Sequence, residues 1–118
     1  MGKVRIIERI DIILKHIDIV ENDIKNMSYE DFCKSDLYVR ATCFSIAQIG
    51  EQMIKLEETL RPNYDYLPWK SIRDMRNIIV HVYNHVNAEV VYLTAKNDLR
   101  ELKKNLLLVK EDYQRKQQ

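Results

Sequence analysis

One short stretch of the chain, residues 73–87, contains the side chains best suited to chemistry. Its sequence is RDMRNIIVHVYNHVN, in which Arg76 precedes His81 by five residues and Tyr83 follows two residues later. Arginine offers a permanent cation with a planar fork of donors that matches a phosphate group, and histidine can accept or release a proton near neutral pH. Such a pair could cleave RNA without a metal ion. The histidine would move a proton at the 2′-hydroxyl or at the leaving oxygen, and the arginine would stabilise the pentavalent phosphorane.

A structural role is the commoner explanation of such a pair. An arginine five residues before a histidine occurs on many helices, where His81 could be a half-buried, hydrogen-bonded residue and Tyr83 a tyrosine at the edge of the core. Glu51, in the segment QIGEQ, also allows either a functional or a structural role. Gly50 before it costs about 1 kcal/mol within a helix and favours a close contact between helices. The residues alone leave both explanations open.

The elements around this stretch are predicted to be long helices, because the chain contains only two Gly and two Pro. In the first segment, apolar residues recur every three or four positions, which is typical of one buried face of a helix. That face consists of Ile6, Ile10, Ile13, Ile17, Val20 and Ile24. Ser28 is the predicted cap of a short helix, and Ser35 is the predicted cap of a long helix that extends to Leu60. The long helix is apolar on more than one side, so a second subunit could cover part of it.

The helix that contains the motif is expected to include Pro68 in its first turn. Its core face spans an arc of about 120° and its polar face an arc of about 140°. The core face consists of Ile72, Met75, Ile78, Ile79 and Val82, and the polar face of Arg73, Arg76, Asn77 and His81. Val80 lies within the polar face, which is natural for a surface that a partner covers. The sequence therefore predicts a dimer whose interface includes Arg76, Val80, His81 and part of the Leu37–Leu60 helix.

Asn87 is the predicted cap of the last helix. The predicted core residues of that helix are Val91, Ala95, Leu99, Leu102, Leu106 and Val109. The polar tail from about residue 111 is expected to fray. Four long helices and a short one indicate an all-α, up-down helical bundle that forms a single domain over residues 1–118.

The composition excludes several classes of protein. The net charge is +1 and the sequence pI is about 7.7, so an RNA site must be a local cluster and not a global field. The sequence has no run of eighteen apolar residues, and Met1–Arg9 carries charges where a signal peptide is apolar, which predicts a cytoplasmic protein without a membrane partner. Cys33 and Cys43 lack the spacing of a metal site and are expected to be reduced thiols. Without a Gly-rich phosphate loop or a cluster of metal ligands, no metal and no cofactor are predicted.

Several segments together resemble the HepT-like toxins of the HEPN superfamily. The segment RNIIVHVY fits the pattern Arg-x4-His-x-Tyr, which is similar to the signature of these toxins. The segments MSYEDF, QIGE, LPWKSIRDMRN and NDLRELK follow the order and spacing of the same family, so the resemblance extends from about Ile6 to Val109. This combination is specific, whereas an Arg-x4-His pair alone is not. Phe44 and Ser45 depart from the pattern, because many relatives have a basic or polar residue shortly before the IGE element.

This resemblance implies an all-helical HEPN domain that acts as a homodimer, with the two motifs facing one another across the interface. Members are metal-independent ribonucleases and toxins, typically paired with a minimal nucleotidyltransferase antitoxin that can transfer AMP to the motif tyrosine. On this chain Arg76 and His81 would be the catalytic pair acting on RNA, Asn77 and Arg73 auxiliary polar residues, and Tyr83 the site of AMPylation. Two other functions are open: a non-catalytic HEPN module that binds a nucleotide or docks a nucleotidyltransferase, and a helical scaffold.

Overall fold

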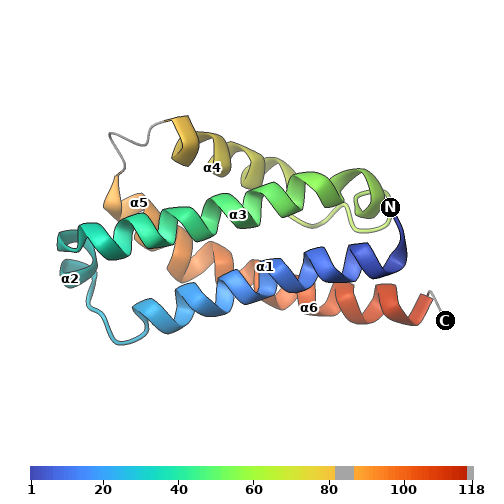
Figure 1. The fold of residues 1–118 in the computed structure, drawn as a ribbon, viewed down its shortest axis with the longest axis horizontal. Coiled ribbons are helices and arrows are strands. Elements are labelled where there is room, and N and C mark those ends of the chain that lie inside the picture. Colours follow the sequence, from blue (N-terminus) through green and yellow to red (C-terminus); the bar gives the residue numbers. More distant parts are fainter. Residues whose placement is uncertain (82–86, 117–118) are drawn as a thin grey trace.

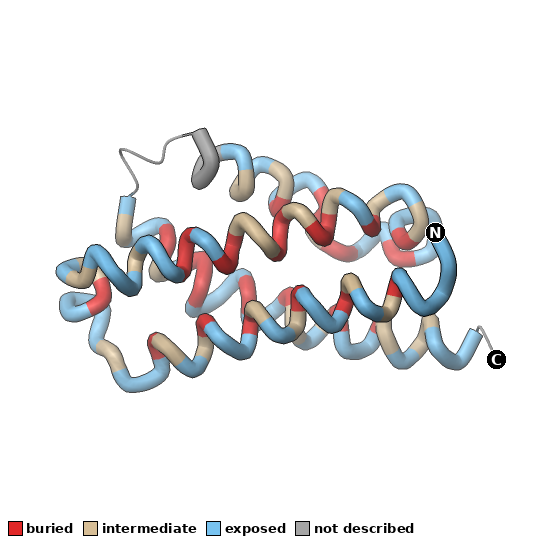
Figure 2. The backbone as a smooth tube through the Cα atoms, in the orientation of Figure 1, coloured by how far each residue is buried: buried red, intermediate tan, exposed pale blue. Residues whose placement is uncertain are grey.

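Two long antiparallel helices lie side by side at the centre of the fold, α1 (Lys3–Ile24) and α3 (Asp36–Leu60) (Figure 1). The computed structural model describes the backbone of residues 1–81 and 87–116, and the side chains of the same ranges except 78–81. All six residues of the predicted apolar face of α1 are buried (Figure 2), which confirms that face. They pack against a row of α3 that consists of Cys43, Ile46, Ile49, Met53, Leu56 and Leu60.

The predicted caps determine where three helices begin. The hydroxyl of Ser28 accepts a hydrogen bond from the backbone N–H of Asp31 at 3.0 Å, and the short helix α2 (Tyr29–Lys34) follows. Ser35 accepts in the same way from Tyr38 at 3.2 Å at the start of α3. The side chain of Asn87 accepts from the N–H groups of the first turn of α5 (Ala88–Leu93). Each cap satisfies a backbone donor that would otherwise have no partner within the helix, which explains why the sequence alone locates these boundaries.

The last helix is continuous but not uniformly α-helical. After α5 comes a π-helical segment, η2 (Thr94–Asp98), and then α6 (Leu99–Lys116). The core positions Val91, Ala95 and Leu99 are spaced by four and again by four, which corresponds to a drift of about 80° around a regular α-helix. Hydrogen bonds from i to i+5 place an extra residue in the turn, and all three side chains are buried.

The tail that the sequence predicts to fray from about residue 111 is helical as far as Lys116. Side-chain contacts explain the difference, because the carboxylate of Asp112 accepts a 2.7 Å hydrogen bond from the hydroxyl of Tyr64. The ammonium of Lys116 lies 3.1 Å from the same carboxylate. The tail is therefore tied to the loop that follows α3.

The helix that contains the motif, α4 (Trp69–His81), packs chiefly on α3 and lies at one side of the bundle (Figure 1). Four long helices and the short α2 make an all-α bundle of the HEPN type, as predicted, and residues 1–81 and 87–116 contain no strand. No helix in these two ranges combines the length and the apolar character needed to cross a membrane.

Candidate active site

The start of α4 is fixed by an aromatic anchor. Trp69 is buried, and its indole Nε1 donates a 3.0 Å hydrogen bond to the backbone carbonyl of Tyr64. The N–H of Ile72, which is also buried, donates to the carbonyl of Pro68 at 3.0 Å. Pro68 therefore immediately precedes α4, which begins at Trp69. The sequence predicts Pro68 within the first turn, one position further along. These contacts fix the rotation of α4 about its axis and so determine which residues face α3.

Arg76 lies on the side of α4 that contacts α3. One nitrogen of its guanidinium, Nη2, forms an ion pair with a carboxylate oxygen of Glu51. Another nitrogen, Nη1, donates to the side-chain oxygen of Asn77 at 3.1 Å, whereas Nε is buried and has no partner among the described residues. The side chain of Arg76 is 30% exposed and that of Glu51 is 38% exposed. The cation is thus held in one orientation but is still reachable from solvent.

Gly50 allows the close approach that this contact needs. A methyl group added at Gly50 would lie 2.6 Å from Cβ and 2.8 Å from Cγ of Arg76. Both distances are shorter than any ordinary carbon–carbon contact, which is about 3.5–4.0 Å. A residue with a side chain at position 50 would therefore push α4 away from α3. The sequence-based inference that Gly50 permits a close helix contact is confirmed, and Arg76 is the residue it contacts.

A second contact between the two helices involves Arg73. Its Nη1 lies 2.5 and 2.7 Å from the two carboxylate oxygens of Glu57 on α3. Glu57 also accepts a 2.6 Å hydrogen bond from Arg61 at the end of α3. Arg73 is thereby bound to its own subunit, although the sequence places it on a polar face that could be directed at a substrate.

The other residues of the motif are described only in part. Asn77 is exposed and contacts Arg76. His81 is the last residue of α4, but its side chain and that of Val80 lie outside the described residues, as does Tyr83 entirely. The position of His81 on the same helix, five residues after Arg76, separates the two by about 140° around the helix axis. The catalytic pair, the auxiliary residues and the modification site therefore stay predictions.

Comparison with known proteins identifies the family. The profile of the family described as "Ribonuclease HepT-like" matches residues 7–109. The chain belongs to the HepT-like ribonuclease family. The matched range includes the whole of α3 and α4, and therefore both the Glu51–Arg76 contact and the Arg-x4-His-x-Tyr pattern.

Relatives of this HepT-like protein are named as ribonucleases. A protein of Methanocaldococcus jannaschii named "Putative RNase" is 32% identical over 104 residues, which cover 88% of this chain and 86% of the relative. A protein of Caldanaerobacter subterraneus subsp. tengcongensis with the same description is 32% identical over 94 residues, or 80% and 84% of the two chains. One of Thermococcus cleftensis, named "Probable ribonuclease HepT", is 25% identical over 91 residues, or 77% and 83%. No solved structure matches the chain.

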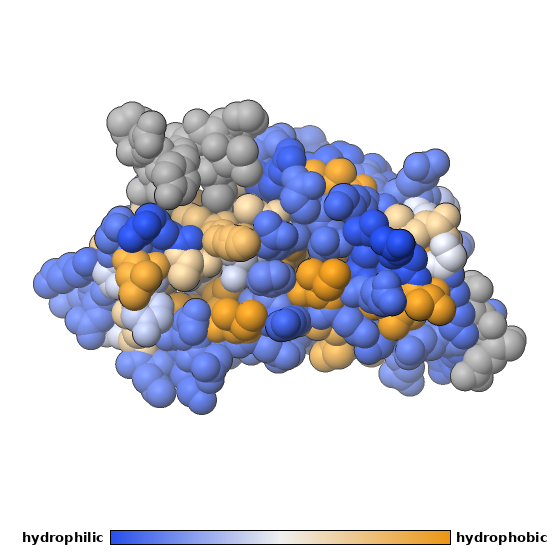
Figure 3. All heavy atoms as spheres, in the orientation of Figure 1, coloured by the Kyte–Doolittle hydropathy of each residue, from blue (hydrophilic) through white to orange (hydrophobic). Residues whose placement is uncertain are grey.

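A row of exposed apolar side chains on α3 leads to the contact between Glu51 and Arg76. Leu37, Ala41 and Phe44 follow one another at helical spacing, and the same row continues through residue 48 to Glu51. Leu37 is 66% exposed and Phe44 is 54% exposed. The side of the molecule formed by α3 and α1 accordingly shows several hydrophobic patches (Figure 3). In this HepT-like domain, the apolar row at Leu37, Ala41 and Phe44 is therefore exposed to solvent. It belongs to the long helix for which the sequence predicts burial against a second subunit.

His16 of α1 lies beside this apolar row. Its ring packs edge-on against Phe44, and its Nδ1 lies 3.3 Å from the hydroxyl oxygen of Ser45. Partial burial lowers the pKa of His16, and the neighbouring Lys15 lowers it further. The imidazole is therefore mostly neutral at pH 7, which suits an apolar surface.

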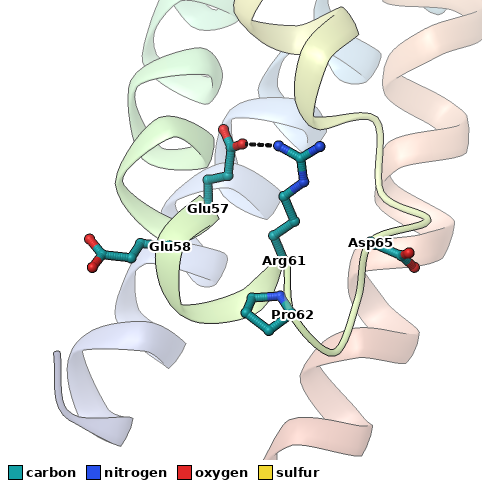
Figure 4. A pocket seen from close by; sticks show the side chains of 5 residues that line it. All are labelled: Glu57, Glu58, Arg61, Pro62 and Asp65. Carbon is teal, nitrogen blue, oxygen red and sulfur yellow. Dashed lines mark hydrogen bonds and ion pairs between the residues drawn. The ribbon is translucent and has the colours of Figure 1, made fainter.

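A shallow depression at the far end of α3 is unsuitable for RNA. It is lined by Glu57, Glu58, Arg61, Pro62 and Asp65, and Figure 4 shows the Arg61 guanidinium directed at Glu57. The lining contains three carboxylates and one cation, and that cation is already paired with Glu57. Such a surface repels the phosphate backbone of RNA. In the described part of the chain, no three His, Cys, Asp or Glu side chains gather closely enough to hold a metal ion. Among the described residues, the Arg76 side of α4 is thus the candidate site.

Proposed function

We propose that this protein is a metal-independent endoribonuclease that acts as the toxin of a toxin–antitoxin pair. The observation that supports this most directly is the position of Arg76. Its guanidinium is partly exposed, held by Glu51, and lies on the helix that ends at His81. Membership of the HepT-like ribonuclease family supports RNA as the substrate class.

In the proposed reaction, the 2′-hydroxyl of a ribose attacks the adjacent phosphorus and the bond to the 5′-oxygen of the next nucleotide breaks. His81 takes the proton from the 2′-hydroxyl or supplies one to the leaving oxygen. Arg76 stabilises the negative charge of the pentavalent phosphorane with the donors that Glu51 and Asn77 leave free. The products are a 2′,3′-cyclic phosphate and a 5′-hydroxyl, and neither step requires a metal ion.

The active form in this proposal is a homodimer. The exposed row of Leu37, Ala41 and Phe44 offers an apolar surface, and it is continuous with Glu51 and hence with Arg76. A twofold axis through this surface would bring two copies of the motif together and double the positive charge at the site, although the net charge of the chain is only +1. RNA would then bind across both subunits.

The antitoxin in this proposal is a minimal nucleotidyltransferase that attaches AMP to Tyr83. Tyr83 follows His81 by two residues, so the attached nucleotide would occupy the space where the RNA phosphate must lie. Its phosphodiester charge could also pair with Arg76 and neutralise the cation that the transition state needs.

RNA cleavage by the purified protein in EDTA is the test of this function. We expect the wild type to produce 2′,3′-cyclic phosphate ends, and Arg76→Ala to reduce kcat/KM by about 10²–10³-fold. His81→Ala should reduce it by about 10²–10⁴-fold. Arg115→Ala removes an exposed arginine near the end of α6 and is the matched control, with activity unchanged.

Two results would contradict the proposed function. Cleavage that disappears in EDTA and returns with a divalent cation would show a metal-dependent nuclease. RNA or nucleotide binding without any cleavage would instead support the non-catalytic HEPN module. In either case the assignment of Arg76 and His81 as a catalytic pair would be wrong.

A further inference from the structure

We propose that Glu51 is a positioning residue for the catalytic arginine, Arg76. Gly50 allows the close contact between α3 and α4 through which the carboxylate of Glu51 reaches Arg76. This inference rests on the proposed function, because it assigns a role within the same site. Glu51 neither contacts RNA nor moves a proton in this proposal. It holds the guanidinium of Arg76 in the orientation that the phosphorane requires.

The contacts of Arg76 define that orientation. A guanidinium is planar, so two contacts on different nitrogens fix both its position and the direction of its plane. Glu51 engages Nη2 from α3, and Asn77 engages Nη1 from α4 at 3.1 Å. Nε faces the interior and is buried. The remaining N–H groups of Nη1 and Nη2 therefore point in directions that the protein sets before RNA arrives.

The exposure of the pair indicates that its role is orientation more than stability. Arg76 and Glu51 are 30% and 38% exposed, and ion pairs of this kind contribute little to folding because water and salt screen them. Preorganisation, in contrast, has a large effect on rate, since a displacement of about 1 Å can reduce catalysis by about a hundredfold. A change at Glu51 should therefore affect turnover far more than the thermal midpoint.

Gly50 and Glu51 act through the same close contact between α3 and α4. Because a side chain at position 50 would collide with Cβ and Cγ of Arg76, it would move the arginine away from the carboxylate of Glu51. Gly50→Ala should thus reproduce the effect of Glu51→Gln without changing any charge. Gly2→Ala is its matched control, because no atom lies within 4 Å of a methyl group added there.

A competing role for Glu51 predicts the opposite sign. If its carboxylate competed with the RNA phosphate for Arg76, removal of the negative charge would raise kcat/KM. If Glu51 positions the arginine, Glu51→Gln should lower kcat by about tenfold to a hundredfold. KM should stay the same or fall, because the site becomes more positive.

The kinetic experiment compares Glu51→Gln with Glu58→Gln. Glu58 lies two turns further along α3 and is exposed, so the second variant makes the same chemical change on the same helix, away from Arg76. We expect a lower kcat only for Glu51→Gln. In an Arg76→Ala background, Glu51→Gln should cause less than about a twofold further loss, because a residue that acts through Arg76 has no effect without it. An unchanged or raised kcat in Glu51→Gln, or a full additional loss in the double variant, would overturn the inference.

A spectroscopic measurement separates this inference from the proposed function. The side-chain Nε–Hε correlation of Arg76, identified by its absence from Arg76→Ala, should shift in Glu51→Gln and in Gly50→Ala. It should not shift in Glu58→Gln or Gly2→Ala. An unchanged correlation in Glu51→Gln overturns the positioning role whether or not the protein cleaves RNA. A wild type that cleaves no RNA overturns the proposed function even if the correlation shifts.

Discussion

The hydroxyl of Tyr64 donates a 2.7 Å hydrogen bond to the carboxylate of Asp112, which joins the loop after α3 to the last turns of α6. The backbone carbonyl of the same tyrosine accepts the hydrogen bond from the indole of Trp69. Tyr64 thus links α6 to the start of α4, at Trp69, which precedes Arg76 by seven residues.

Tyr64→Phe should destabilise the fold and leave the active site intact. The variant keeps the buried ring but removes one hydrogen bond to a charged group, so we expect the thermal midpoint to fall by roughly 5 °C. Tyr66→Phe is the control, because Tyr66 is exposed. Calorimetry of the two variants measures the difference, and an equal midpoint for both would show that the bond to Asp112 contributes nothing.

The same pair predicts how stability depends on pH. Burial and the bond to Asp112 raise the pKa of Tyr64 to about 12, so its contribution is complete below about pH 10 and is lost as the pH rises through 12. The bonds from Tyr64 and Lys116 lower the pKa of Asp112, whose contribution is present above about pH 4 and is lost as the pH falls through that lowered value. Chemical denaturation of wild type and Tyr64→Phe should therefore give stabilities that converge between pH 10 and 12. A constant difference across that interval would contradict the assignment.

Phe44→Arg should convert the proposed dimer into a monomer. A twofold interface places the substitution in both copies, and loss of a buried aromatic anchor typically costs about 2 kcal/mol or more, which is about thirtyfold in Kd. Leu108→Arg is the matched control, since Leu108 is 56% exposed on α6 and Phe44 is 54% exposed on α3. Analytical ultracentrifugation at micromolar concentration distinguishes them. A monomeric wild type, or a dimer that only Leu108→Arg disrupts, would place the interface elsewhere or remove it.

Arg76→Lys should separate the charge of the residue from its geometry. Lysine keeps the positive charge, so RNA affinity should change little. Its single ammonium cannot contact both Glu51 and Asn77 and also offer a planar pair of donors to the phosphorane. We expect kcat to fall by about tenfold or more while KM stays within about threefold. A lysine variant with wild-type kcat would show that only the charge matters.

Tyr83 should be the acceptor of AMP from a nucleotidyltransferase partner. In that step the phenolic oxygen attacks the α-phosphorus of ATP, pyrophosphate leaves and the phenolic proton is released to solvent. Incubation with the partner, ATP and Mg²⁺ should add the mass of AMP to the wild type and reduce RNase activity in proportion. Tyr83→Phe should stay an active nuclease without the added mass. An adduct that leaves cleavage unchanged would show that modification of Tyr83 does not silence the protein.

The sequence predicts the helices and their caps because these features depend on local rules. The buried face of α1 follows from a spacing of three and four residues, and Ser28, Ser35 and Asn87 begin helices because their side chains bond to N–H groups two or three residues away. The family resemblance was also accessible from the sequence, since its segments are contiguous.

The contacts of the candidate site were not predictable in the same way. Glu51 and Arg76 are 25 residues apart and meet only because α4 folds back on α3. The one local signal was a glycine in the middle of a long helix, which indicated a close contact but not its partner. Arg73 shows the same limit, because its ion pair with Glu57 depends on the packing of the two helices. The assumption of a uniform α-helix after Asn87 likewise missed the π-helical segment.

The number of residues in the π-helical segment η2 determines how α5 and α6 are rotated relative to one another. On one side of it α5 contacts α2 and α3, and on the other side α6 contacts α1. Insertion of one more residue between positions 94 and 98 would rotate one half relative to the other by about 100°, so only one of the two surfaces could dock. Deletion of one residue would instead remove the extra residue, leave a regular α-helical turn and keep both surfaces in register. Substitution of the exposed Lys96 or Asn97 would leave the relative rotation of α5 and α6 unchanged. At this point in the gene, single-codon insertions should be far less tolerated than single-codon deletions or missense changes.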